Sequence, residues 1–361
     1  MKELRLLKGN EAVAEAAIRA GADAYFGYPI TPQSEIMEYL VDRQPETTTG
    51  MVILQAESEV AAINMVYGAS AAGRRVMTSS SSPGISLMTE GISYLAGAEL
   101  PCLIVNVTRG GPGLGTIQPS QADYFQSVKG GGHGDYRLLV LAPASVQEMA
   151  DFVALGFDLA FKYRNPVMML ADGVIGQMME KVELPKPLPK RETVEAWAVT
   201  GKTPERERNV ITSLNLDALK HERHNLKLQA KYRQMEREDT RYDTYLCNDA
   251  EYIITAYGAS ARISKKTVDL ARDKGIKVGL FRPVTLFPFP SKELATVSQH
   301  VEGILSVEMS AGQMIEDVLL ATRCRVPVRH FGRNGGVVHA PGEILEALEQ
   351  FINSKEKQHQ E

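Results

Sequence analysis

The sequence has little of what marks membrane proteins, nucleic-acid-binding proteins or metal–sulfur proteins. No run approaches the roughly 18 consecutive apolar residues that a bilayer span needs. The formal net charge is −4, which gives no electrostatic footprint for nucleic acid. No C-x-x-C pair is present to build a zinc or iron–sulfur site, and the three cysteines lie far apart, at Cys102, Cys247 and Cys324. We interpret them as ordinary thiols in a reducing compartment, and we expect no membrane and no nucleic acid partner.

The composition is that of a globular protein. Apolar residues make up 44% and charged residues 23% of the 361 residues, which does not indicate disorder. At roughly 100 to 200 residues per domain, this length suits two domains. The N-terminal segment MKELRLLKGNEAVAEAA carries acids and lacks the apolar core of a secretion signal, so we expect a cytoplasmic protein.

Short apolar runs alternate with segments of helical periodicity. In the first half the runs are DAYFGYPI, GMVILQ, RRVMTSS, PCLIVNV, RLLVLA and NPVMMLA. After Ala250 the rhythm resumes with EYIITAYGAS, IKVGLF, VEGILSVE and RVPVRHFG. This alternation predicts mostly parallel sheets with helices on both faces, which is a doubly wound α/β fold.

Changes in composition predict the domain boundaries. The segment ELPKPLPKRETVEAW brings three prolines and mixed charge just where the first domain would end, near Leu184. Residues 202–239 are dense in charge, and we interpret them either as a solvated connecting helix or as a contact with a partner subunit. The predicted organisation is a first α/β domain over 1–184, a charged linker with a helix over 185–246, a smaller α/β domain over 247–352 and a polar tail over 353–361.

Two glutamates stand where an apolar strand leads into an alanine-rich helix, in the stretch LQAESEVAAINMVYGASAAG. At about 100° per residue, Glu57 and Glu59 lie on opposite sides of this helix. Glu59 shares its side with Ala62, Ile63 and Val66. Because Glu57 lies on the opposite side from these apolar residues, we interpret it as a solvated acid favoured by the helix dipole. Glu59 is either the same or a buried carboxylate, which costs roughly several kcal/mol unless it is neutralised or finds a partner.

A buried acid of this kind suits sharing a proton with a ring nitrogen. Thiamine diphosphate requires such an acid, because a carboxyl group against N1′ of its aminopyrimidine makes the exocyclic nitrogen basic enough to deprotonate C2 of the thiazolium. We therefore expect Glu59 to be both a catalytic and a cofactor-binding residue.

Several motifs then resemble one family. Glu59, the pair Ala61 and Ala62 and the run Gly68 to Ser70 resemble the pyrimidine-binding helix of thiamine-dependent oxoacid enzymes. Four further motifs resemble the α subunit of 2-oxoacid:ferredoxin oxidoreductases, most closely the branched-chain 2-oxoacid (2-ketoisovalerate) type: FGYPITPQSEIMEYL, TSSSSPGISLMTEGISYLAGAELP, NVTRGGPGLGTIQPSQADYF and GGHGDYRLLVLAPAS. The segment FRPVTLFPFP resembles the transketolase C-terminal-like domain of that family. The resemblance implies a thiamine-diphosphate pyrimidine-binding domain followed by a smaller transketolase C-terminal-like domain.

The resemblance also implies roles for residues near the cofactor. It places the YPITP motif at the thiamine and substrate pocket, with Tyr28, Pro29 and Ile30 at the cofactor and Thr31 at the substrate. The Thr31 hydroxyl is able to donate to a substrate oxygen, or alternatively to cap the helix that follows. Arg109 comes directly after an apolar strand, where open α/β sheets bind ligands. The resemblance implies that Arg109 binds the substrate carboxylate, and a structural salt bridge is the alternative.

Three other features leave two interpretations open. The run RGGPGLGT lacks the full G-x-G-x-x-G spacing, so we favour a mobile loop over the pocket, with unusual backbone angles at Gly110, Gly111 and Gly113, over a dinucleotide site. The run TSSSSPG either contacts the cofactor or caps a helix starting near Gly84, and capping is favoured. His133 is either structural or part of the pocket.

The half of a thiamine site that holds the diphosphate is missing from this chain. Thiamine enzymes hold Mg²⁺ and diphosphate with a G-D-G motif and downstream asparagines, whereas this chain has only ADGVIG at Ala171. The resemblance therefore implies a β subunit that binds Mg²⁺ and the diphosphate. It also implies γ and ferredoxin-like δ subunits, with iron–sulfur clusters on the partner subunits only.

The function implied by the resemblance is oxidative decarboxylation. A 2-oxoacid, of the branched-chain type, reacts with coenzyme A to give acyl-CoA, CO₂ and reduced ferredoxin, and the chain is active only with its partner subunits. Two alternatives stay open: the same reaction on 2-oxoglutarate or pyruvate, and a non-catalytic assembly subunit in which Glu59 is a solvated acid.

Overall fold

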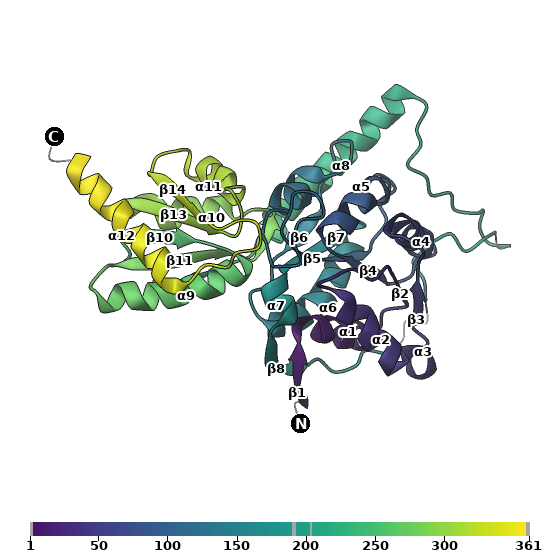
Figure 1. Ribbon diagram of the computed structural model, residues 1–361. Coiled ribbons are helices and arrows are strands. Elements are labelled where there is room, and N and C mark those ends of the chain that lie inside the picture. The colour runs from purple at the N-terminus through teal and green to yellow at the C-terminus, as the bar shows by residue number, and fades with distance from the viewer. Residues whose placement is uncertain (1–2, 190–192, 203, 359–361) are drawn as a thin grey trace.

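The computed structural model describes residues 3–189, 193–202 and 204–358. It consists of two lobes side by side, each built around its own sheet (Figure 1). Parts of the predicted linker, 190–192 and 203, and the end of the predicted polar tail, 359–361, lie outside the described residues.

The first lobe contains a seven-stranded sheet. Its strands lie in the order β12 (Thr285–Phe287), β6 (Leu139–Leu141), β7 (Val167–Asp172), β5 (Leu103–Thr108), β4 (Val76–Ser80), β2 (Ala24–Gly27) and β3 (Val52–Gln55). All neighbours are parallel except β12, which pairs antiparallel with β6. Every residue of β5 is buried, as expected for a parallel strand covered on both faces. Each of the six apolar runs predicted as strands in the first half overlaps one of β2 to β7.

Helices cover both faces of this sheet. One face carries α1 (Gly9–Arg19), α2 (Ser34–Arg43) and α6 (Val146–Tyr163), and the other carries α4 (Glu59–Ala71) and α5 (Ser82–Gly97). Alternate residues of β5 serve the two cores, because Leu103 and Val105 pack with α1 and α6, whereas Ile104 packs with α4 and α5. The connections contain α3 (Pro45–Thr48), α7 (Gly173–Gln177) and the π-helical turn η1 (Gln126–Gly130).

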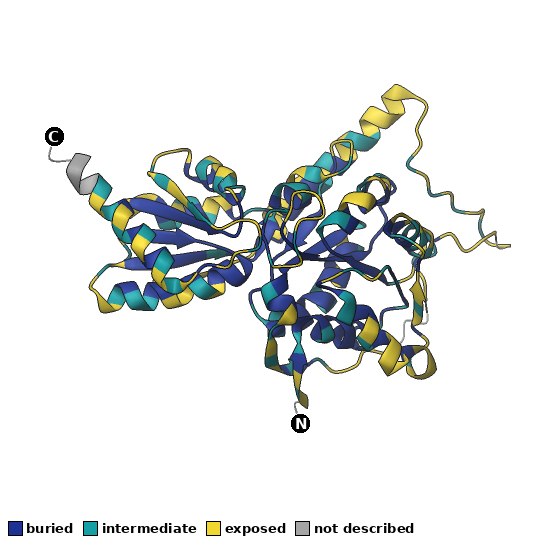
Figure 2. Cartoon of the chain, viewed as in Figure 1, coloured by how far each residue is buried: buried dark blue, intermediate teal, exposed yellow. Residues whose placement is uncertain are grey.

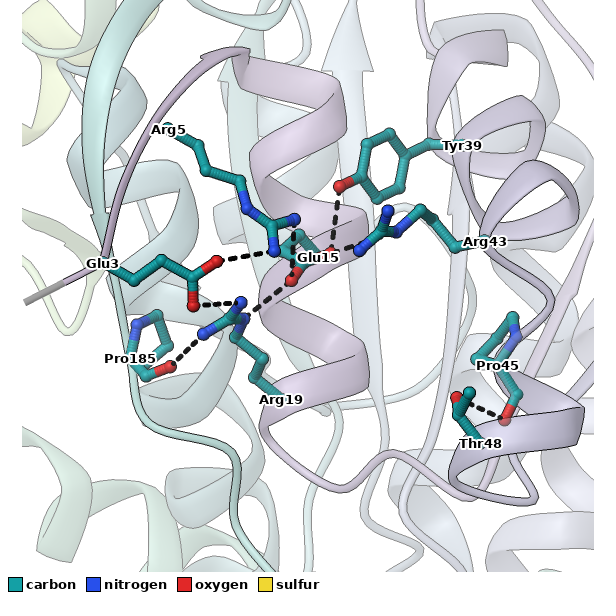
Figure 3. A network of polar contacts seen from close by, with 9 residues as sticks. All are labelled: Glu3, Arg5, Glu15, Arg19, Tyr39, Arg43, Pro45, Thr48 and Pro185. Atoms are coloured by element: carbon teal, nitrogen blue, oxygen red, sulfur yellow. Dashed lines mark hydrogen bonds and ion pairs between the residues drawn. The ribbon is translucent and has the colours of Figure 1, made fainter.

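The N-terminal strand β1 (Glu3–Lys8) pairs antiparallel with β8 (Met179–Leu184). Charged side chains around Glu15 connect β1 to α1 (Figure 3). The Glu15 carboxylate is buried and accepts hydrogen bonds from Arg19 Nε at 2.7 Å and from the Tyr39 hydroxyl at 2.9 Å. Arg5 reaches it at 3.3 Å, and Arg19 also contacts Glu3 at 2.7 Å. Because removing one partner of a buried pair leaves an uncompensated charge, this network holds β1 and α2 against α1.

The charged segment between the lobes consists of an extended arm and the long helix α8 (Ala218–Glu238), whose first turns project from the body (Figures 1 and 2). Most of α8 is exposed, and its buried residues are Leu228, Tyr232 and Met235. The chain then enters the second lobe as β9 (Tyr242–Tyr245), so the last part of the predicted linker is a strand of the second sheet.

The second lobe has a five-stranded sheet in the order β14 (Val328–Gly332), β13 (Gly303–Glu308), β10 (Tyr252–Thr255), β11 (Val278–Pro283) and β9. Its strands are parallel except β9. One face carries α9 (Gly258–Asp273) and α12 (Pro341–Gln358), and the other carries α10 (Ser291–Val297), the 3₁₀ turn η2 (Ser298–His300) and α11 (Met314–Thr322). The doubly wound α/β class is thus confirmed.

The two lobes share both a sheet and a core. The strand β12 leaves the second lobe to pair with β6 of the first, and one apolar core contains residues of both lobes, among them Leu170 and Met314. Within the described part of the chain, the helices are all too short or too polar to cross a bilayer.

Candidate functional site

The side chains predicted to bind ligands gather at one edge of the first sheet. Strands β2, β4 and β5 run parallel, and the residues that follow their carboxyl ends are the YPITP motif, Ser81 and Arg109. The amino ends of α4 and α5 lie at the same edge, because these helices follow β3 and β4. Ligands of open α/β sheets bind outside the carboxyl ends of the strands, so this edge is the candidate site.

Glu59 is the first residue of α4. Ser58 caps the helix, and its hydroxyl accepts a hydrogen bond from the amide of Ala61 at 3.2 Å. Glu59 is only 6% exposed, whereas Glu57 is exposed and bonds the Ser58 hydroxyl. Glu59 therefore lies on the buried side of the helix, as the 100° spacing predicts, and the interpretation of Glu59 as a solvated acid is wrong. Glu57 precedes the N-cap and lies outside the helix.

The Glu59 carboxylate lies against the first turn of α5. A β-carbon on Gly84 would lie 2.5 Å from Glu59 Oε1 and 2.0 Å from Ser80 Oγ, so only glycine leaves room for both groups. Among the described residues, no side chain or backbone group forms a hydrogen bond or ion pair with the Glu59 carboxylate. A buried carboxylate without a partner is costly, so its position is expected to be completed by a ligand.

Buried hydroxyl groups line the same corner. The side-chain oxygens of Thr78, Ser80 and Ser81 are buried and have no hydrogen-bond partner within the described residues. Ser81 occupies the N-cap position of α5 but its side chain makes no capping bond, and Ser82 instead contacts the backbone of Arg109. The interpretation of the serine run as a helix cap is therefore wrong. What the run supplies is a set of unused donors and acceptors, of which the Ser80 hydroxyl lies beside Glu59.

The YPITP loop is held by side chains from three neighbouring elements. The Gln33 side chain donates to the carbonyl of Tyr28 at 3.2 Å and accepts from the Ser79 hydroxyl at 2.6 Å. The carbonyl of Pro32 accepts from Asn10 at 2.7 Å and from Gln177 at 2.9 Å. Buried groups thus fix the base of the loop. Its tip remains accessible, because Tyr28 and Ile30 are half-buried whereas Pro29 and Thr31 are exposed.

Thr31 and Arg109 come together through the backbone of the loop. The Arg109 guanidinium donates through Nη1 to the carbonyl of Thr31 at 3.0 Å and through Nη2 to the carbonyl of Leu114 at 3.3 Å. Its Nε is buried without a partner, and no carboxylate among the described residues pairs with it. The alternative that Thr31 caps α2 is wrong, because Gln33 is the N-cap residue.

The glycine-rich run forms a tight loop from Gly110 to Gln118. Its two ends are joined because the amide of Gly110 donates to the carbonyl of Gln118 at 2.9 Å. Gly113 and Gly115 adopt left-handed backbone angles, with φ of 69° and 56°. The unusual angles predicted for Gly110 and Gly111 are not found, so that part of the prediction is wrong. The loop follows β5 and extends over the Arg109 side chain.

Asp172, in the ADGVIG segment, is fully engaged in joining the two lobes. Its carboxylate caps α7 through the amides of Val174 and Ile175, at 3.1 and 3.2 Å, and accepts from the amide of Ala259 at the start of α9, at 2.8 Å. Burial raises the pKa of Asp172, and these amides oppose the shift. Within the described residues, no group of three or more His, Cys, Asp and Glu side chains is arranged to hold a metal ion.

His133 lies apart from this site. It is exposed, meets the Tyr94 ring edge-on at 6.0 Å, and lines a cavity of about 460 Å³ with residues of α5 and α8. The structure therefore does not bring His133 together with Glu59 or Arg109.

Sequence reasoning missed the groups that support the site. Gly84 and Gln33 lie inside the family motifs, but their importance depends on tertiary contacts. Gly84 faces Glu59 and Gln33 bonds Ser79, and no local sequence pattern predicts either contact. A second missed pair is Asp123 with Asn106, joined at 2.9 Å beneath Ser82. Burial raises the pKa of Asp123, and the hydrogen bonds from Asn106 and Ser82 oppose this.

Comparison with known proteins agrees with this arrangement. Residues 15–244 match the family described as pyruvate flavodoxin/ferredoxin oxidoreductase, thiamine diphosphate-binding. Residues 250–344 match core domain II of pyruvate:ferredoxin oxidoreductase.

Curated relatives span nearly the whole chain. The ketoisovalerate oxidoreductase subunit VorB of Methanothermobacter marburgensis is 52% identical over 347 residues, which are 96% of this chain and 97% of the relative. The 2-oxoglutarate synthase subunit KorA of Archaeoglobus fulgidus is 38% identical over 352 residues, 96% of this chain and 99% of the relative.

Two solved structures are similar in fold. A 2-oxoglutarate:ferredoxin oxidoreductase from Magnetococcus marinus, solved with 2-oxoglutarate, coenzyme A and succinyl-CoA, superposes with a TM-score of 0.86 at 27% identity. The match covers 97% of this chain but only 65% of that longer chain. A split-gene transketolase at 13% identity, with a TM-score of 0.60 over 95% of this chain and 97% of its own, shares the fold alone. The chain belongs to the pyruvate flavodoxin/ferredoxin oxidoreductase family, the thiamine-diphosphate-dependent 2-oxoacid:ferredoxin oxidoreductases.

Proposed function

We propose that this chain is the subunit of a 2-oxoacid:ferredoxin oxidoreductase that holds the aminopyrimidine of thiamine diphosphate, and that the complex acts on branched-chain 2-oxoacids such as 2-oxoisovalerate. The reaction joins the acyl group of the 2-oxoacid to coenzyme A, releases CO₂ and passes two electrons to ferredoxin. We expect the complex in the cytoplasm. The substrate preference is supported by the 52% identity with a ketoisovalerate oxidoreductase subunit.

One observation carries the proposal: the Glu59 carboxylate is buried, has no partner among the described residues, and occupies a space kept open by Gly84. These residues fit the edge of an aminopyrimidine, which presents a ring nitrogen and an amino group. Thiamine diphosphate, when bound, supplies a nucleophilic carbon and an electron sink for decarboxylation. The unpartnered hydroxyls of Ser80 and Ser81 are placed to bond polar atoms of the same ring.

The chain's own residues then have distinct tasks. Glu59 shares a proton with the ring nitrogen, and its dry surroundings favour this pairing over hydration. Arg109 binds the carboxylate of the 2-oxoacid, because its Nε has no partner and its two other hydrogen bonds are to backbone carbonyl groups, which do not neutralise its charge. The Thr31 hydroxyl orients the substrate from the rim, and Tyr28, Pro29 and Ile30 form the wall beside the cofactor.

The remaining half of the site is proposed to come from partner subunits. Asp172 already uses its carboxylate on backbone amides, so we assign Mg²⁺ and the diphosphate to a β subunit. Apolar side chains are exposed around the site, at Leu54, Val60, Leu87, Leu114 and Ile117, which is typical of a surface that another chain covers. The γ and ferredoxin-like δ subunits, with the iron–sulfur clusters, complete the proposed complex.

The test is Glu59→Gln in the complex assembled with its partner subunits. Glutamine keeps the size of the side chain but cannot hold the proton, so turnover should fall by roughly 100-fold or more, the usual size of a general acid–base contribution. Glu57→Gln is the matched control, because Glu57 is exposed two residues away. Wild-type turnover in Glu59→Gln would refute the role of Glu59.

The non-catalytic alternative makes a different prediction about the cofactor. If this chain were only an assembly subunit, it would add nothing to the affinity of the β subunit for thiamine diphosphate, as measured by isothermal titration. Comparing rates on 2-oxoisovalerate, 2-oxoglutarate and pyruvate in the same complex decides the substrate, since a relative at 38% identity is a 2-oxoglutarate synthase subunit.

A further inference from the structure

The glycine loop that carries Arg109 is in direct contact with a turn of the second lobe. This turn, Asn334 to Gly336, follows β14, more than two hundred positions further along the chain. A β-carbon on Gly110 would lie 3.0 Å from the amide nitrogen of Gly336, so the two backbones approach as closely as glycine allows. The loop is therefore not free on all sides. Its inner side rests on the second lobe, and its tip, with Leu114, is exposed.

Gly336 is the point at which the two segments are tightest. It adopts a φ of 94°, and a β-carbon there would lie 2.6 Å from Cβ of Gln118 and 2.8 Å from Cγ2 of Thr116. Cβ of Gln118 is attached to the backbone and cannot swing aside, so a side chain at Gly336 has to push the loop away. Gly335, next to it, also has a positive φ of 61°, but a β-carbon there would meet nothing within 4 Å.

The frame behind both segments is rigid. The end of β13 binds the residues that follow the loop, because the carbonyl of Met309 accepts from the amide of Gln121 at 2.8 Å. It also binds the residue that precedes the turn, because the amide of Arg333 donates to the carbonyl of Glu308 at 3.2 Å. The Glu308 carboxylate is fully buried and accepts five hydrogen bonds, from the hydroxyls of Ser306 and Ser310 and the amides of Gln313, Met314 and Ile315.

The loop in turn holds the arginine. Nη2 of Arg109 donates to the carbonyl of Leu114 at the tip of the loop, and Nη1 donates to the carbonyl of Thr31. If the loop moves relative to the turn of the second lobe, the Leu114 carbonyl moves with it. The Arg109 guanidinium then has to move as well or lose its hydrogen bond to that carbonyl.

We propose that Gly336 is a positioning residue for the 2-oxoacid: the turn of the second lobe seats the glycine loop, and the seated loop sets the orientation of the Arg109 guanidinium that receives the substrate carboxylate. The second lobe, whose described residues place no side chain beside Glu59, thereby controls substrate affinity. This inference rests on the proposed function, because it takes Arg109 to bind the carboxylate.

The experiment compares Gly336→Ala with Gly335→Ala in the complete complex. Both substitutions strain a left-handed backbone, but only Gly336→Ala pushes the loop. Because Arg109 binds the carboxylate in the ground state and the transition state alike, KM for the 2-oxoacid should rise about tenfold in Gly336→Ala while kcat changes less than about twofold. KM should stay within about twofold of wild type in Gly335→Ala, and the affinity for thiamine diphosphate should be unchanged in both.

Two further variants act on the loop itself. Gln118→Gly removes the atom that a β-carbon on Gly336 meets first, so adding it to Gly336→Ala should recover part of the KM change, while the contact with Cγ2 of Thr116 at 2.8 Å remains. Thr116→Ser removes the methyl group that touches the turn and keeps the hydroxyl that accepts from the amide of Gln118, so it should raise KM about threefold even if Gly336→Ala fails to assemble.

Equal KM values in Gly336→Ala and Gly335→Ala would overturn the inference, and so would a wild-type KM in Thr116→Ser when Gly336→Ala does not assemble. Failure of the proposed function is a separate result, because the wild-type complex would then not turn over any 2-oxoacid.

Discussion

Replacing Gly84 with alanine tests whether the position of the Glu59 carboxylate matters for catalysis. The new β-carbon would lie 2.5 Å from Glu59 Oε1, 2.9 Å from its Cγ and 2.0 Å from Ser80 Oγ. The carboxylate is the end of a flexible side chain and no bond among the described residues holds it, so it moves more readily than the backbone of α5.

The size of the effect follows from these distances. An ordinary contact begins at 3.4 Å, so the carboxylate oxygen has to withdraw by about 0.9 Å. A misplacement of about 1 Å at a reacting group can cost on the order of 100-fold in rate, so we expect kcat of the assembled complex to fall by roughly that factor. Stability should change little, because alanine is favoured over glycine in a helix by up to about 1 kcal/mol, which offsets part of the crowding.

The assay measures kcat with saturating 2-oxoisovalerate and the thermal unfolding of the same preparation. Gly91→Ala is the matched control on the same helix, because its β-carbon would lie 2.5 Å from Cγ2 of Ile63, in the apolar contact between α4 and α5. It should lower stability and leave kcat near wild type. Wild-type kcat in Gly84→Ala, or an equal loss in both variants, would refute the reasoning that the carboxylate needs this space.

Two predictions concern the junction between the lobes. Burial lowers the pKa of His339 from 6.5 to about 4, so the unfolded chain takes up a proton that the folded chain excludes between these values. The free energy of unfolding should therefore fall by about 3 kcal/mol as the pH drops from 6.5 to 4, and His339→Gln should flatten this dependence in denaturant titrations; a parallel pH profile in the variant would contradict it. Asp172→Ala should lower the free energy of unfolding by about 2 to 4 kcal/mol, since it removes a helix cap and leaves the buried amide of Ala259 without a partner. Asp172→Asn keeps an oxygen for the cap but turns an amide donor toward the amide of Ala259, so it should still lose part of this stability; wild-type stability in Asp172→Asn would argue against the bond between the lobes.

Local patterns were sufficient for the strands and for the side of α4 that carries Glu59. A strand in a parallel sheet is buried on both faces, so it must be apolar throughout, and LIVNVT in β5 shows this in the sequence alone. The spacing of residues around a helix is equally local, and it placed Glu59 on the buried side with Ala62, Ile63 and Val66. The motifs added the family, which the relatives confirm.

Local sequence patterns gave two wrong interpretations, both of helix caps, because the partner of each side chain depends on the tertiary structure. The serine run has the composition of a helix cap, but the hydroxyls of Ser80 and Ser81 bond no amide of α5, and that of Ser80 lies beside Glu59. Thr31 likewise precedes α2 closely enough to cap it, yet the cap position falls to Gln33, whose side chain is drawn away to Ser79.

The sequence by itself determined the doubly wound fold, the family and the acid at the start of α4, because each follows from periodicity or from a contiguous motif. Only the tertiary structure decided that Gly84 opens the space for that acid, that β12 joins the first sheet and that Gly336 meets the loop of Arg109. These contacts join residues that are distant in the chain, and close packing imposes their steric limits only once the elements are brought together.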